Sequence, residues 1–211
     1  CARIEDSDMK KEIVAVTDRA LCSGDFLQQL QRLATSGVSA IILREKDLSE
    51  VQYLQLARQC QQSLAGYPVP LVINQQIAVA RTLQCRQLQL SFSLFVDYHS
   101  TLTDFEQVWV SIHSITEALQ AEQLGADRLI AGHIFATDCK KDLEPRGLDF
   151  LQQVCQTVSL PVYAIGGIEQ ADIPALMKTG ITGIAISGTI IRAKDPVQET
   201  RNLLETILSS L

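Results

Sequence analysis

The chain has 211 residues, of which 46% are hydrophobic and 20% are charged, and its formal net charge is −6. This length and apolar content predict one soluble domain with a full core. The acidic balance, without a basic stripe or many aromatic side chains, argues against nucleic acid as a partner. No apolar stretch reaches the roughly eighteen residues that span a bilayer, and the polar start is not typical of a signal peptide. We therefore expect a cytoplasmic protein with no membrane partner.

Short β-rich runs recur along the chain, and amphipathic stretches with helical spacing lie between them. In chain order the expected strands are 12–19, 40–46, 70–75, 87–91, 108–114, 127–134, 161–168 and 183–190, and clear helical patterns cover 25–37, 49–66, 115–126 and 147–158. Such alternation predicts parallel strands covered by helices.

The number of these units predicts a single-domain (β/α)8 TIM barrel over residues 9–211, preceded by a polar tail over 1–8. A doubly wound open sheet is the alternative, but no GxGxxG segment follows the first strand. The six cysteines show no CxxC pair and no metal-ligand spacing. We interpret them as reduced and mostly buried thiols.

In a barrel the active site lies in the loops at the C-terminal ends of the strands, so polar residues at those ends are candidates for function. After the second strand, Arg44 and Lys46 could bind a carboxylate or phosphate, or could form a solvated turn paired by Glu45. Asn74 ends the third strand, and Ser111 lies near the end of the fifth.

Glycine-containing turns follow the last two strands, as Gly166-Gly167 and as Ser187-Gly188. Glycine lets backbone N–H groups approach an anion, and this corner of a barrel is the usual phosphate site. The turns therefore predict a phosphorylated small molecule, although they could also be tight connections without a ligand.

Of the three histidines, His133 is the best candidate for catalysis, because it follows small residues at the exit of the sixth strand. An imidazole can take and return a proton near neutral pH. His113 could face the same opening or be structural, and His99 is expected in a surface loop. Asp18 and Glu45 also lie at strand ends, but a neighbouring Arg or Lys is expected to keep them ionised and paired. No cluster of acidic residues or histidines predicts a metal site.

Taken in order, the motifs VTDR, LREK, IN, VSIHS, GHIFATDCKK, AIGGI and AISGTI resemble those of thiamine phosphate synthase and its relatives, the TenI-like thiazole tautomerases. The resemblance covers nearly the whole chain from the first strand to the last. It implies a homodimer or higher homo-oligomer, because barrels of this group are often dimers.

Departures from the synthase pattern favour the tautomerase branch. The aspartate that binds magnesium after the third strand of the synthase is Gln75 here, and QLQLSFSLF replaces the segment with the further acidic ligand. The loop ATDCKK keeps Thr137 and Lys140 but has Cys139 in place of a second threonine. It is similar to the tautomerase loop, in which the residue aligned with His133 is catalytic.

The tautomerase resemblance implies an isomerase that aromatises the thiazole carboxylate phosphate tautomer made by thiazole synthase, its functional partner, with no metal or cofactor. The alternatives are a thiamine phosphate synthase, which couples a pyrimidine diphosphate to thiazole phosphate, and a non-catalytic regulator that binds a thiamine precursor. We expect the phosphorylated thiazole to contact Arg44, Lys46, Asn74, Ser111, Thr137, Lys140, Gly167, Ser187 and Gly188.

Overall fold

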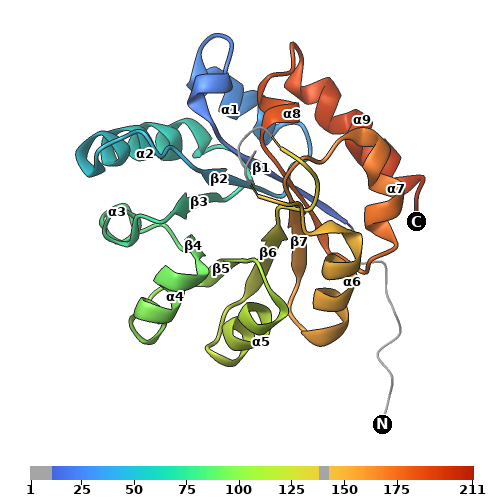
Figure 1. Cartoon of the computed structure of the whole chain (residues 1–211). Coiled ribbons are helices and arrows are strands. Elements are labelled where there is room, and N and C mark those ends of the chain that lie inside the picture. Colours follow the sequence, from blue (N-terminus) through green and yellow to red (C-terminus); the bar gives the residue numbers. More distant parts are fainter. Residues whose placement is uncertain (1–10, 138–142) are drawn as a thin grey trace.

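The computed structural model of the protein describes residues 11–137 and 143–211. It shows a closed barrel of eight parallel strands surrounded by helices (Figure 1). The strands are β1 (Glu12–Val16), β2 (Ala40–Leu43), β3 (Leu71–Asn74), β4 (Gln87–Ser91), β5 (Gln107–Ile112), β6 (Arg128–Gly132), β7 (Val162–Ile165) and β8 (Gly183–Ile186). Each pairs with the next, and β8 pairs with β1. The predicted TIM barrel is therefore confirmed, while the predicted tail over 1–8 lies outside the described residues.

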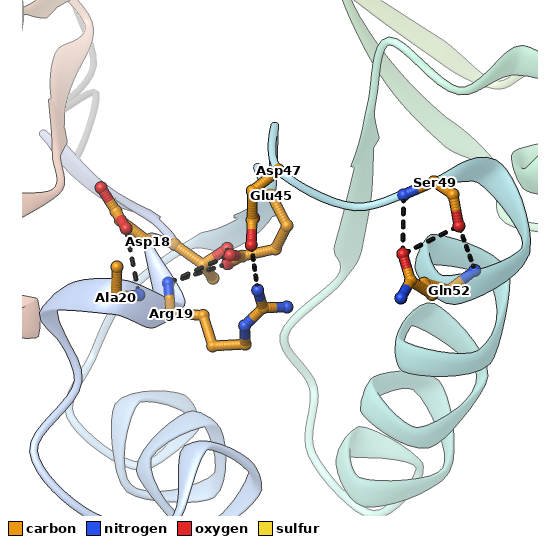
Figure 2. Close-up of polar contacts among 8 residues, drawn as sticks. Asp18, Arg19, Ala20, Glu45, Asp47, Ser49 and Gln52 are labelled. Carbon is orange, nitrogen blue, oxygen red and sulfur yellow. Dashed lines mark hydrogen bonds and ion pairs between the residues drawn. The ribbon is translucent and has the colours of Figure 1, made fainter.

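The helices form a ring outside the strands (Figure 1). They are α1 (Phe26–Ala34), α2 (Glu50–Leu64), α3 (Ile77–Thr82), α4 (Phe92–Tyr98), α5 (Ile115–Gln123), α6 (Gly147–Thr157), α7 (Ile173–Met177), α8 (Gly188–Ile191) and α9 (Pro196–Leu208), with short 3₁₀ helices at 19–21, 99–101 and 170–172. Polar caps mark several starts. At α2, Ser49 and Gln52 form a reciprocal capping box (Figure 2). In the described part of the chain, none of the helices combines the length and apolarity that crossing a membrane requires.

Two apolar layers follow from the alternation of side chains along each strand. On β1, Val14 and Val16 point into the barrel, whereas Ile13 and Ala15 pack against the helices outside. The strands are buried on both faces, as is usual for parallel sheets covered by helices.

The N-terminal end of the barrel interior is filled by large side chains. Trp109 and Tyr163 stack with ring centroids 5.1 Å apart, and the Arg128 guanidinium lies 4.8 Å from the Trp109 ring. Glu12 accepts a hydrogen bond from the Tyr163 hydroxyl at 2.7 Å and pairs with Arg128 at 3.2 Å. This end is closed, and the open space lies at the other end.

Several strands end earlier than their apolar runs predicted. After β1, Asp18 caps the 3₁₀ helix at 19–21 through the N–H of Ala20. After β7, Gly166 and Gly167 have φ values of +102° and +65°, which leave the β region. The last strand was predicted to continue to Ile190 because this residue is apolar, but Ile190 belongs to the short helix α8.

Candidate active site

A cavity of about 840 Å³ opens at the C-terminal ends of the strands. Every predicted site residue in the described part of the chain lines this one cavity: Arg44, Lys46, Asn74, Ser111, His133, Thr137, Gly167, Ser187 and Gly188. Lys140 lies outside the described residues. The structure therefore brings the predicted residues together, although they come from six different strand ends.

His133 lines the cavity and is only 4% exposed. Its Nε2 lies 3.2 Å from the main-chain carbonyl oxygen of Leu143. A carbonyl can only accept, so Nε2 carries the hydrogen and the neutral ring has its lone pair on Nδ1. The main chain of His133 is also held, because the His133 carbonyl accepts a hydrogen bond from the Arg146 N–H at 2.9 Å. Nδ1 is therefore the ring atom that can take a proton.

His113 lines the same cavity after β5 but is less enclosed, with 38% of its side chain exposed. Glu117 holds this residue from the first turn of α5. Its carboxylate accepts the His113 main-chain N–H at 2.6 Å and lies 3.7 Å from Nδ1. The expectation for His99 was wrong in part, because it begins a 3₁₀ helix, is half-buried and has its Nδ1 bonded to the Val96 carbonyl.

A line of hydrogen-bonded side chains crosses the cavity floor from β3 to β5. Gln89 lies in the middle, with its Oε1 accepting from Asn74 Nδ2. Its Nε2 donates to the Leu90 carbonyl at 2.9 Å and to Ser111 Oγ at 2.7 Å. Gln89 was not predicted from the sequence. The signal that could have found it is the alternation of polar residues along β4, where it faces the barrel interior.

Hydrogen bonds join the segments that follow β1 and β2 to each other (Figure 2). Glu45 is 6% exposed and accepts hydrogen bonds from the Thr17 hydroxyl at 2.7 Å and the Arg19 N–H at 3.1 Å. The Arg19 guanidinium instead pairs with Asp47. Glu45 does not line the cavity. Its carboxylate bonds to Thr17 and Arg19 after β1, and not to the Arg44 and Lys46 side chains on either side of it.

Burial raises the pKa of Glu45, even though hydrogen bonds from Thr17 and Arg19 oppose this effect. The expectation from the sequence considered only the basic neighbours, whereas burial opposes the ionised form of this carboxyl. The cause is desolvation, which depends on the packing of two strands and is not visible in the REK sequence.

The turns after β7 and β8 present backbone N–H groups to the cavity. Within residues 11–137 and 143–211, no main-chain carbonyl accepts a hydrogen bond from the N–H of Gly167, Ser187 or Gly188. A Cβ on Gly167 would lie 2.7 Å from the Phe135 carbonyl oxygen and would collide with that of Ala136. Only glycine fits there, beside the loop that follows His133.

Among the described residues, the cationic side chains that line the cavity are Arg44, Lys46 and Arg192. Arg192 was not predicted. Its Cζ lies 4.0 Å from the position that a Cβ would take on Gly188, so the guanidinium covers the turn after β8. Its place one helical turn after Gly188 could have indicated it. The acidic residues Asp18, Glu169 and Glu199 also line it.

The magnesium site of the synthase pattern does not fit this cavity. Gln75 occupies the position of the aspartate after β3, and Ser91 ends β4 where the resemblance implied a second acidic ligand nearby. Within the described residues, His, Cys, Asp and Glu side chains nowhere gather in a group of three that could hold a metal ion.

Comparisons with known proteins agree with this fold. The model of a family described as thiamine monophosphate synthase matches residues 13–190. Thiamine-phosphate synthase 2 of Streptococcus pneumoniae is 34% identical over 184 residues, covering 86% of this chain and 88% of the relative. Thiamine-phosphate synthase of Desulfitobacterium hafniense is 32% identical, covering 90% of this chain and 94% of the relative.

A solved structure of thiamine phosphate pyrophosphorylase from Pyrococcus furiosus superimposes with a TM-score of 0.81 at 26% identity, covering 96% of this chain and 98% of that one. A 3-hexulose-6-phosphate synthase with 19% identity and a TM-score of 0.70, covering 93% of this chain and 99% of that one, shares the fold. The chain therefore belongs to the thiamine monophosphate synthase family, among the enzymes of thiamine biosynthesis.

Proposed function

We propose that this protein is a thiazole tautomerase, which aromatises a thiazole carboxylate phosphate tautomer by a proton shift. The observation that carries the proposal is the environment of His133. Its ring is enclosed in the cavity, its Nε2–H donates to the Leu143 carbonyl, and its Nδ1 is left as a base.

In this reaction Nδ1 of His133 removes the proton from ring C2 of the substrate. The electron pair of that C–H bond forms the C2=N bond, the former C=N pair moves into the ring carbon–carbon bond, and the exocyclic double bond opens. The exocyclic carbon then takes the proton back from the imidazolium. No atom is gained or lost. Proton transfer by a positioned side chain contributes roughly 10²–10⁴-fold to a rate.

The phosphate of the substrate is assigned to the turns after β7 and β8. Backbone N–H groups of Gly167, Ser187 and Gly188 are available there, and the Arg192 guanidinium lies beside them. Backbone donors and a guanidinium are suited to a phosphate dianion. This places the anchored end of the substrate one strand away from His133, because β6 and β7 are neighbours.

Coupling of a pyrimidine diphosphate to thiazole phosphate is the second candidate, and the names of the relatives fit it better than they fit isomerisation. The side chains of the cavity rim favour isomerisation. Gln75 and Ser91 stand where the synthase pattern leads us to expect acidic magnesium ligands, and without those ligands a diphosphate leaving group loses the metal ion that would stabilise its charge.

One experiment separates the two candidates. The protein is mixed with freshly generated thiazole synthase product, and the rise of aromatic absorbance is followed. In parallel, thiamine phosphate formation is assayed with and without magnesium. We expect accelerated aromatisation and no coupling. Thiamine phosphate formed at roughly 1 s⁻¹ or faster, with aromatisation no faster than without protein, would assign the coupling reaction instead.

A further inference from the structure

The direction of each hydrogen bond in the cavity floor is fixed by one main-chain group. The Leu90 carbonyl can only accept, so the Gln89 atom beside it at 2.9 Å must be the amide nitrogen. Gln89 Oε1 then faces Asn74, which must turn its own amide nitrogen toward it. The same Gln89 nitrogen donates to Ser111 Oγ at 2.7 Å.

This fixed polarity determines which groups Asn74 and Ser111 can offer to a ligand. Asn74 donates one of its two amide N–H groups to Gln89, so it keeps one N–H donor and its carbonyl acceptor. Ser111 Oγ accepts from Gln89, and the part of the chain that the structure describes contains no acceptor for its own hydroxyl proton. Because Ser111 lines the cavity, its O–H is available as a donor to a bound anion.

The order of the strands shows which part of a substrate meets Ser111. In the closed barrel of eight strands, β3 stands opposite β7 and β4 opposite β8. A ligand whose phosphate lies at the β7 and β8 turns therefore extends its other end toward the floor between β3 and β5. His133, directly after β6, lies between the two ends. In the proposed substrate, that other end is ring C2 with its carboxylate.

We infer that Ser111, held by Gln89, donates a hydrogen bond to the substrate carboxylate and so selects a carboxylated thiazole. Gln89 is a positioning residue, which acts through Ser111 and does not touch the ligand's carboxylate itself. This inference rests on the proposed function for the identity of the ligand. It assigns the carboxylate to the Ser111 hydroxyl group, which Gln89 orients.

Binding measured by calorimetry tests this inference with two probes, the aromatic thiazole carboxylate phosphate and the thiazole phosphate that lacks the carboxylate. Ser111→Ala should weaken binding of the carboxylated probe roughly tenfold or more, and binding of the other probe far less. Gln89→Met should weaken binding of the carboxylated probe roughly threefold or more, a smaller effect because the hydroxyl remains but is no longer oriented. In the double variant, Gln89→Met should add nothing to Ser111→Ala.

Ser91→Ala is the matched control. Ser91 also ends a strand at the cavity, but its hydroxyl donates to Gln75 Oε1 at 3.5 Å, so the preference between the probes should not change. Melting temperatures of all variants separate a loss of folding from a loss of binding. The inference is overturned if both probes lose affinity equally, if the two substitutions add fully, or if neither probe binds. Selective binding without aromatisation would leave it standing and remove the proposed function.

Discussion

At the scale of single residues, the two histidines of the cavity differ in what surrounds them. His133 is enclosed and hydrogen-bonded to a carbonyl, whereas His113 is more exposed and held by Glu117. We predict that His133→Asn lowers kcat for aromatisation about 100-fold or more, because the base is removed. Product affinity should change little, since the anion-binding groups remain. Steady-state kinetics with product-binding measurements checks both parts.

His113→Asn is the comparison for this prediction, since it removes the other imidazole of the same cavity and should keep most of the activity. The reverse pattern would make His113 the base. If both variants stay active, the imidazole mechanism itself is wrong, and transfer through the substrate's own carboxylate becomes the better account.

The position of His133 could be predicted because a polar residue after small residues at a strand exit is a local pattern. Its Leu143 partner could not, because that contact joins two ends of a loop whose path no spacing rule gives. Gln89 was missed for a similar reason. Its importance comes from neighbours on two other strands, and only the register of β3, β4 and β5 brings them together.

At the scale of elements, the glycines in the turns after β7 and β8 differ in what a side chain would meet. At Gly188 a Cβ would meet only the Arg192 guanidinium, at 4.0 Å. We predict that Gly188→Ala folds normally but raises the Kd of phosphorylated product about tenfold, because a methyl group intrudes beside the N–H donors. Calorimetry and a melting curve measure the two effects, and affinity for the dephosphorylated alcohol should be unchanged.

Gly167→Ala serves as the contrast, because there a Cβ collides with main-chain carbonyls and φ is +65°. This variant should lose about 1 kcal/mol of stability or more whether or not a ligand is present. Equal phosphate affinity in Gly188→Ala and the wild type would count against the phosphate site. Sequence alone predicted both turns but could not distinguish these roles, which depend on the distance to the loop after β6.

At the scale of the whole molecule, the barrel could be predicted because alternating strands and helices admit few closed arrangements. The family prediction was also confirmed. The branch within the family stays a proposal, because the names of the relatives favour the coupling reaction whereas the cavity residues favour isomerisation. The ends of the strands could not be predicted well. Apolar residues such as Ile190 continue past the last strand pair into a helix that packs on the same core.

The stability of the whole barrel should depend on pH through Glu45, which joins β1 to β2. Its raised pKa means that the folded protein keeps a proton that the unfolded chain has already lost, over the interval above the ordinary glutamate value. The contribution of Glu45 is therefore fully present below about pH 4.3, and it is lost as pH rises through the folded-state pKa. The loss amounts to about 1.4 kcal/mol for each unit by which the pKa is raised.

Glu45→Gln should remove this dependence, since one amide oxygen can still accept from Thr17 and Arg19 and the side chain no longer titrates. We therefore predict that the stability of the wild type relative to Glu45→Gln, measured by urea unfolding between pH 4 and 8, falls as pH rises. Glu50→Gln makes the same chemical change on an exposed side chain in the first turn of α2. Its stability relative to Glu45→Gln should still fall as pH rises, as that of the wild type does. A difference that is flat or rises with pH would show that the hydrogen bonds to Glu45 outweigh its desolvation.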